Sequence, residues 1–164
     1  MRYAQIRPFD VANGVGVRTT IFVTGCRNHC PSCFNPSYQD FSFGEEWTEK
    51  ETETVISHLK NPVVAGLTLL GGEPMQNLEL TEIVRKIRAA VDTNIWVYSG
   101  YTYEQILADP AKKALLDECD VLVDGLFVEA LLDLKLKFRG SSNQRILDIK
   151  RSEEAGHPVE MELP

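Results

Sequence analysis

Cys26-Arg27-Asn28-His29-Cys30-Pro31-Ser32-Cys33 is the most distinctive stretch of this chain, because it holds three of the four cysteines within eight residues. It follows an apolar run, residues 19–23, that is typical of a strand. Thiolates this close together converge on one soft metal centre when the loop folds back on itself. A closed structural site takes four ligands, whereas three leave one position open for chemistry. The spacing therefore predicts a reactive metal centre on Cys26, Cys30 and Cys33.

Two other interpretations of the cysteines stay open at this point. A disulfide is disfavoured, because clustered cysteines in a reducing compartment more often bind metal or react. A structural zinc site would need His29 or Cys119 as its fourth ligand. His29 is adjacent to Cys30, and Cys119 precedes a predicted strand, which puts it at the opposite end of the sheet, about 16 Å away. We expect Cys119 to be a buried apolar side chain, and we favour an iron–sulfur cluster over zinc.

Length and composition predict one globular domain. The chain has 164 residues, of which 43% are hydrophobic and 25% charged, enough for a substantial core. The net charge of -7 argues against a nucleic-acid-binding protein. The N-terminus lacks the apolar stretch of a signal peptide, so none is expected, and no apolar run reaches the roughly 20 residues of a membrane span. We expect a cytoplasmic protein with a single domain over residues 1–150 and a charged, mobile tail over 151–164.

Strand and helix patterns alternate along the chain. The predicted strands are 18–24, 66–70, 94–98 and 120–124, with a fifth candidate at 145–149. Helices should begin after the caps Thr48, Asn77, Thr102 and Asp109. Residues 8–17 should be a turn-rich entry and 128–134 a short helix. The pattern predicts an α/β fold with a parallel sheet and crossover helices, open or a partial barrel because too few units exist to close one.

The unusual residues all follow predicted strands, where function collects in such sheets. They are the cysteine loop, Gly71-Gly72-Glu73-Pro74, Ser99-Gly100-Tyr101 and Asp124-Gly125. The two glycines allow a ligand to approach the backbone, and Glu73 offers an acceptor suited to an ammonium group. Ser99 is a ligand contact or a cap, and Asp124 is a ligand contact or a turn acid. We expect these four loops to form one active site.

Together these motifs resemble the radical S-adenosylmethionine superfamily, and more closely the small glycyl-radical activases that act on anaerobic ribonucleoside-triphosphate reductase. The resemblance covers about residues 1–150. It rests on Asn13-Gly14 and on residues 26–35, 71–74, 99–101, 121–127 and 139–144. It implies a partial radical-SAM β/α barrel of about five strands. The short chain is similar to those activases, which lack the extra cluster domains of larger ones.

The resemblance also implies the ligands. Cys26, Cys30 and Cys33 would hold a [4Fe–4S] cluster whose fourth iron takes the amino and carboxylate groups of S-adenosylmethionine. Gly71, Gly72 and Glu73 would meet the methionyl amino group, and Ser99 and Asp124 would contact the remainder. The superfamily usually has an aromatic residue before the third cysteine, near the adenine. Here Ser32 stands there and Phe34 follows Cys33, so Ser32 and Phe34 become the candidate adenine contacts.

The implied activity is that of an oxidoreductase. One electron, from a donor such as flavodoxin or ferredoxin, would cleave S-adenosylmethionine to methionine and a 5′-deoxyadenosyl radical. That radical would remove a hydrogen atom from a glycine of the large reductase subunit, with no side chain acting as acid or base. Residues 139–144 are a candidate docking edge. The alternatives are an activase of another glycyl-radical enzyme and a zinc-stabilised adaptor without catalysis. Neither a nucleic acid nor a membrane is expected as a partner.

Overall fold

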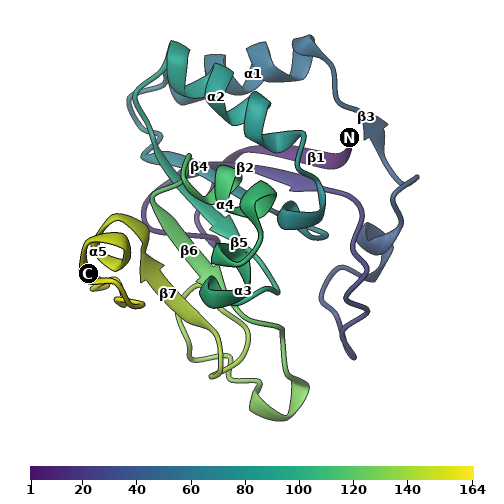
Figure 1. The fold of residues 1–164 in the computed structure, drawn as a ribbon. Coiled ribbons are helices and arrows are strands. Elements are labelled where there is room, and N and C mark those ends of the chain that lie inside the picture. The colour runs from purple at the N-terminus through teal and green to yellow at the C-terminus, as the bar shows by residue number, and fades with distance from the viewer.

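The computed structural model describes residues 1–164 as a seven-stranded sheet with the order β3-β1-β2-β4-β5-β6-β7 (Figure 1). The central strands β2 (Arg18–Val23), β4 (Gly66–Gly71), β5 (Asn94–Tyr98) and β6 (Val121–Asp124) are parallel. The outer strands β1 (Arg2–Asp10), β3 (Glu45–Glu46) and β7 (Arg145–Asp148) pair antiparallel with their neighbours. The α/β class and the parallel centre are confirmed, and antiparallel strands border that centre on both sides.

Four α-helices and three short 3₁₀ turns lie between the strands, and a fifth α-helix follows the last strand. The helices are α1 (Glu49–Leu59), α2 (Leu80–Ala90), α3 (Tyr103–Leu107), α4 (Pro110–Leu116) and α5 (Ile149–Ala155). The turns are η1 (Pro36–Gln39), η2 (Pro74–Gln76) and η3 (Glu129–Leu131). None of the helices is long and apolar enough to cross a membrane.

Three predicted caps begin helices in the structure. Thr48 and Thr102 form capping boxes, and the Asp109 carboxylate accepts from the backbone of Ala111 and Lys112. The prediction for Asn77 is wrong, because α2 begins three residues later, at Leu80. The side-chain amide of Asn77 instead donates to the carbonyls of Gly25 and Glu73. It holds the loop after β4 against the root of the cysteine loop.

The two faces of the sheet are covered differently. Alternate strand residues such as Leu69, Val97 and Leu122 join a core cluster of 20 buried side chains with residues of the helices. Helices α1 and α2 lie side by side over this face (Figure 1). The other face carries a smaller cluster of Trp96, Val121, Val123 and Ile146. Because no helix covers that second face, its edge stays open for a cavity.

Strand β1 is the element that the sequence analysis missed. Only a turn-rich entry was expected from residue 8, but residues 2–10 pair with β2. The pairing shifts register twice, between Tyr3 and Gln5 and between Arg7 and Asp10. Such irregularities remove the strict alternation by which a strand is recognised, and Pro8 further weakens the pattern. Nearly all of β1 is half-buried, with no clear inner and outer face.

The C-terminal segment is also more ordered than expected. Helix α5 occupies the start of the predicted tail, and the Met161 amide donates to the Ile146 carbonyl over 2.8 Å. Met161 and Leu163 pack against the Trp96 cluster. In place of the short helix expected over 128–134 there is only η3. Cys119 is buried as predicted, near the amino end of β6, and its thiol donates to the Leu115 carbonyl.

Candidate functional site

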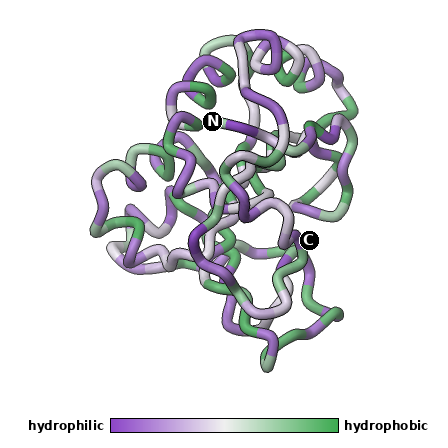
Figure 2. The backbone as a smooth tube through the Cα atoms, turned by 90° about the vertical axis from the view of Figure 1, so that its right-hand side faces the viewer, coloured by the Kyte–Doolittle hydropathy of each residue, from purple (hydrophilic) through white to green (hydrophobic).

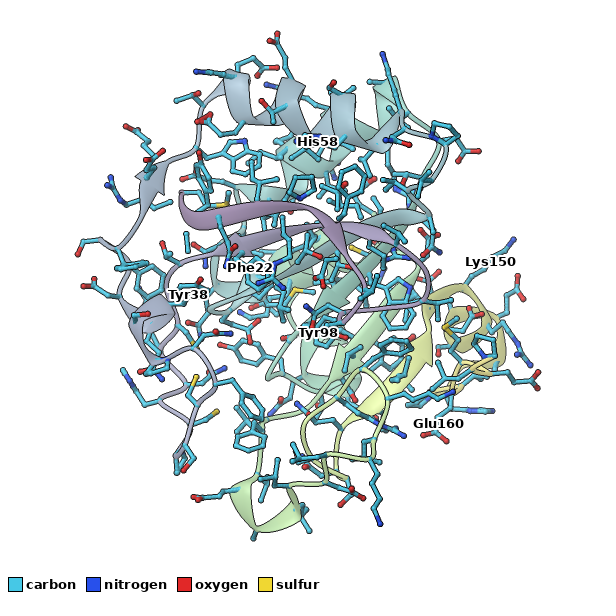
Figure 3. The ribbon with its side chains drawn as sticks, turned by 180° about the vertical axis from the view of Figure 1, so that it is seen from behind. Phe22, Tyr38, His58, Tyr98, Lys150 and Glu160 are labelled. Atoms are coloured by element: carbon cyan, nitrogen blue, oxygen red, sulfur yellow. The ribbon has the colours of Figure 1, made fainter.

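A cavity of about 530 Å³ lies at the carboxyl ends of β2, β4 and β5. The cysteine loop, the glycine motif and the loop after β5 all line it, through Cys26, Cys30, Cys33, Gly71, Gly72, Glu73, Ser99 and Gly100. Phe22 and Tyr98 form part of its floor on the helix-free face (Figure 3). The structure therefore brings together loops that are separated by up to about 70 residues along the chain, as the strand order predicted.

The cysteine loop is shaped by its backbone. Its root is held where the amides of Gly25 and Cys26 donate to the carbonyls of Tyr38 and Gln39. His29 and Ser32 both adopt left-handed backbone angles, with φ of 48° and 56°, which turns the loop back on itself. The three thiols are free and half-buried. All three thiols line the same cavity.

The surroundings of the thiols suit a cationic centre. Burial raises the pKa of the Cys26 thiol, an effect that the nearby Glu73 carboxylate strengthens and the Asn28 amide opposes. Burial also raises the pKa of Cys30, and the charge of Cys33 adds to it. Bare thiolates are therefore disfavoured here. A positively charged iron–sulfur core offsets that cost, so three soft donors in one half-buried cavity fit the cluster that the sequence implied.

The Glu73 carboxylate is buried and accepts hydrogen bonds from groups of the protein itself. It accepts from the Met75 amide and the Ser99 hydroxyl at 2.9 Å each, and from the Gly100 amide at 2.6 Å. The Asn28 side chain donates to it over 3.3 Å. These four donors occupy the acceptor sites of a carboxylate. Burial raises the pKa of Glu73 despite these bonds. The side chain braces three loops and has no acceptor capacity left for a ligand ammonium.

The two glycines are required by chain packing. Gly71 has φ of 107°, and a Cβ there would overlap the Val23 carbonyl. A Cβ on Gly72 would lie 2.7 Å from the carbonyl oxygens of Gly25 and Tyr38. Gly71 thus lets the end of β4 lie close to β2, and Gly72 lets the loop after β4 approach the root of the cysteine loop. The Gly72 carbonyl accepts no hydrogen bond within the chain, which leaves an oxygen of the motif free beside the cavity.

Asn28 and Gln76 are site residues that sequence reasoning missed. The Gln76 side chain accepts from the Arg27 amide over 2.7 Å and donates to Asn28 and to the Tyr101 hydroxyl. The Asn28 amide in turn lies 3.4 Å from the Cys26 sulfur. These bonds tie the cysteine loop to the loop after β5. The only available signal was position, because Asn28 lies inside the cysteine motif and Gln76 two residues after Gly-Gly-Glu-Pro.

Ser99 and Asp124 are both used within the chain. The Ser99 hydroxyl donates to Glu73 and accepts from the Tyr101 amide, so it bonds to its own turn and to the loop after β4. The buried Asp124 carboxylate pairs with Arg145 and accepts from the Tyr103 amide. Asp124 does not line the cavity that holds the cysteines, although Gly125 does. The cofactor contact expected at Asp124 stays a prediction.

Part of the cavity wall is aromatic, and one of its rings belongs to Phe34, directly after Cys33. Phe34 packs against Phe127 with ring centroids 4.8 Å apart, and both line the cavity. Ser32 is exposed and lies outside the lining. Beside them the Tyr98 hydroxyl donates to the Phe138 carbonyl over 2.7 Å. Of the two candidate adenine contacts, the structure brings Phe34 to the cavity and leaves Ser32 outside it.

Comparisons with known proteins agree with this geometry. The model of a family described as "4Fe-4S single cluster domain" matches residues 12–147. A protein of Vibrio cholerae is 39% identical over 152 residues, which cover 89% of this chain and 97% of that protein. One of Escherichia coli K12 is 39% identical over 88% of this chain and 96% of its own, and one of phage T4 is 37% identical over 89% and 93%. All three relatives are named anaerobic ribonucleoside-triphosphate reductase-activating protein.

Proposed function

This chain belongs to the family of anaerobic ribonucleoside-triphosphate reductase-activating proteins, and we propose that the cavity at the carboxyl ends of β2, β4 and β5 is where it activates its reductase. It is an oxidoreductase that uses a [4Fe–4S] cluster and S-adenosylmethionine. The observation that carries the proposed location is that three free thiols and the glycine motif line one cavity. The cavity size falls in the range of about 300–1,000 Å³ that is typical of small-molecule sites.

In this proposal Cys26, Cys30 and Cys33 ligate the cluster. When bound, the reduced cluster and S-adenosylmethionine supply the one-electron chemistry that removes a hydrogen atom from a glycine Cα of the reductase, leaving methionine and 5′-deoxyadenosine. The free Gly72 carbonyl would accept a hydrogen bond from the methionyl amino group, because the Glu73 carboxylate is already saturated by protein donors. The carboxylate holds the loop that presents this carbonyl.

The remaining walls position the cofactor and exclude water. Phe34 and Phe127 offer an apolar surface to the adenine, and the backbone of Ser32 lies two residues before Phe34 in the chain. Ser99 acts through Glu73 as a positioning residue. No side chain of the cavity is needed as an acid or base. The partial barrel belongs to this proposal, and the helix-free face of the sheet beside the cavity supports it. The proposal also includes a cytoplasmic location and an electron donor such as flavodoxin or ferredoxin.

Anaerobic purification followed by iron and sulfide analysis tests this function. Wild type should be brown, should produce 5′-deoxyadenosine with dithionite, and should give a glycyl-radical paramagnetic resonance signal when mixed with the reductase. Replacing Cys26, Cys30 or Cys33 by Ala should abolish all three results. Cys119→Ala is the matched control, because its thiol is buried at the other end of β6, and it should keep its iron. A colourless protein carrying one zinc would instead identify a non-catalytic adaptor.

A further inference from the structure

The chain between β6 and β7 forms an arm, residues 126–144, that projects beyond the edge of the sheet (Figure 1). Its two sides are joined where the Ser142 amide donates to the Leu131 carbonyl and the Asp133 amide to the Gly140 carbonyl. The Gln144 side chain fastens its base, since it donates to the Gly125 carbonyl and accepts from the Gly140 and Ser141 amides. The arm is thus a defined hairpin-like structure with a fixed base.

The outer part of the arm is unusually apolar for a surface. Five of the twelve large hydrophobic side chains that the chain exposes lie on it, namely Leu126, Val128, Leu131, Leu132 and Leu134. Leu134 is 86% exposed, and Leu131 and Leu132 are 43% and 45% exposed. Hydrophobic stretches along the arm are visible at the bottom of Figure 2. An exposed apolar cluster of this kind marks an interaction site.

The arm is continuous with the cavity. Leu134, Leu136, Phe138 and Arg139 belong to the arm and also line the cavity that holds the cysteines. One apolar surface therefore runs from the exposed tip into the site. The substrate of the proposed function is a glycine within another polypeptide. A polypeptide segment that carries this glycine into the cavity would meet the arm residues that line it, and this makes the reductase the occupant that best explains the exposed leucines.

We propose that the leucines at the tip of the arm dock an apolar segment of the reductase next to its glycine, and so place that glycine over the cavity. This inference rests on the proposed function, and it extends the docking edge expected at residues 139–144 to the tip of the arm. It assigns partner binding to Leu131 and Leu132, which do not line the cavity. Their substitution should therefore separate partner binding from cofactor chemistry.

The test compares wild type with the double variant Leu131→Asp/Leu132→Asp. Its control is Val63→Asp, because Val63 is 64% exposed and lies before β4, at the opposite end of the sheet from the cavity. Dithionite-driven 5′-deoxyadenosine formation without the reductase should be unchanged in both. The arm variant should require about tenfold or more reductase for half-maximal glycyl-radical signal, as expected when two apolar contact residues are replaced by charged ones that the interface would have to bury. The control should match wild type.

Hydrogen exchange on the wild-type protein provides a second readout that does not depend on a variant folding. Adding the reductase should slow exchange at residues 128–137 and leave residues 60–65 unchanged. Normal titration of the arm variant, or an arm that exchanges equally fast with and without the reductase, overturns the proposal. Protection of the arm by a second copy of this chain alone also overturns it. A wild type that fails to cleave S-adenosylmethionine refutes the proposed function instead, and the binding data then stand separately.

Discussion

Gln76 shows how a single side chain outside the cysteine motif supports the site. Its amide group uses its acceptor for Arg27 and its donors for Asn28 and Tyr101. Gln76→Ala removes all three contacts, so the cysteine loop should hold its cluster less firmly. Because residues that orient metal ligands typically contribute 10–100-fold, iron release to a chelator should be faster by about tenfold or more.

Two further variants make this prediction specific. Gln76→Glu keeps the acceptor for Arg27 and loses both donors, so its iron release should fall between wild type and Gln76→Ala. Gln105→Ala removes a capping contact of α3 that touches no residue of the cysteine loop, and its iron release should equal that of wild type. Equal release rates in all four proteins would show that Gln76 does not position the loop.

Asp10 gives a prediction about pH at the same scale. Burial alone would raise its pKa, but hydrogen bonds from Asn13, Ala12 and Thr20 outweigh burial and lower the pKa below its usual value. The stabilisation is therefore present above the unfolded-state pKa of about 3.9 and is lost as the pH falls through the folded-state pKa. Asp10→Asn should unfold more easily at pH 7, by about 1–3 kcal/mol.

The pH dependence of that difference is the informative measurement. In urea titrations of the cluster-free protein, the gap in unfolding free energy between wild type and Asp10→Asn should narrow below about pH 4. A gap that stays constant from pH 7 to pH 3 would mean that ionisation of Asp10 contributes nothing to folding.

The residues of the site differ in how far their positions and roles could be predicted from the sequence. The three cysteines and the glycine motif could be predicted because spacing and strand order determine where they lie. The roles of Glu73 and Asp124 could not, because each carboxylate bonds to groups 20 or more residues away, such as Ser99 and Arg145. A carboxylate in a turn looks the same in sequence whether its partner is a ligand or a distant donor.

At the scale of elements, the junction of β2 with β4 depends on the absence of a Cβ at Gly71. Gly71→Ala should lower the free energy of unfolding by about 3 kcal/mol or more, because it combines a left-handed backbone with an overlap onto Val23. Gly156 is the matched control. It also has positive φ, 74°, at the end of α5, but a Cβ there meets nothing within 4 Å.

Gly156→Ala should therefore show only the backbone strain, about 1 kcal/mol. Urea unfolding of the two cluster-free variants measures the difference, and equal losses would contradict the packing explanation.

Helix starts were easier to predict from the sequence than strand β1. The caps Thr48, Thr102 and Asp109 act within a few residues, whereas β1 depends on pairing with β2 and on two shifts of register.

At the scale of the whole molecule, the helices cover one face of the sheet, and the arm and the C-terminal segment cover the other. The alternation of strands and helices predicted the first face. That alternation did not predict what covers the second face, because the arm and the C-terminal segment have no hydrophobic periodicity. Trp96 joins the parts of this second face. Its ring lies 5.5 Å from that of Phe138 on the arm, and Met161 and Leu163 pack against the same cluster.

Deletion of residues 157–164 should therefore affect both stability and the arm. It removes the hydrogen bonds from Met161 to Ile146 and from Asp148 to Val159, and it uncovers the Trp96 cluster. We expect a loss of about 2–4 kcal/mol in unfolding free energy, from the burial of two apolar side chains. Tryptophan emission should shift to longer wavelength as Trp96 meets water.

The double variant Glu160→Ala/Glu162→Ala is the control, since it changes charge on the same segment and keeps Met161 and Leu163. It should unfold like wild type. Because Phe138 packs on Trp96 and also lines the cavity, the truncated chain should further show faster hydrogen exchange in residues 126–144 than the control. An unchanged arm in the truncated protein would mean that the C-terminal segment stabilises the sheet alone, and that the arm is held by the Gln144 contacts at its base.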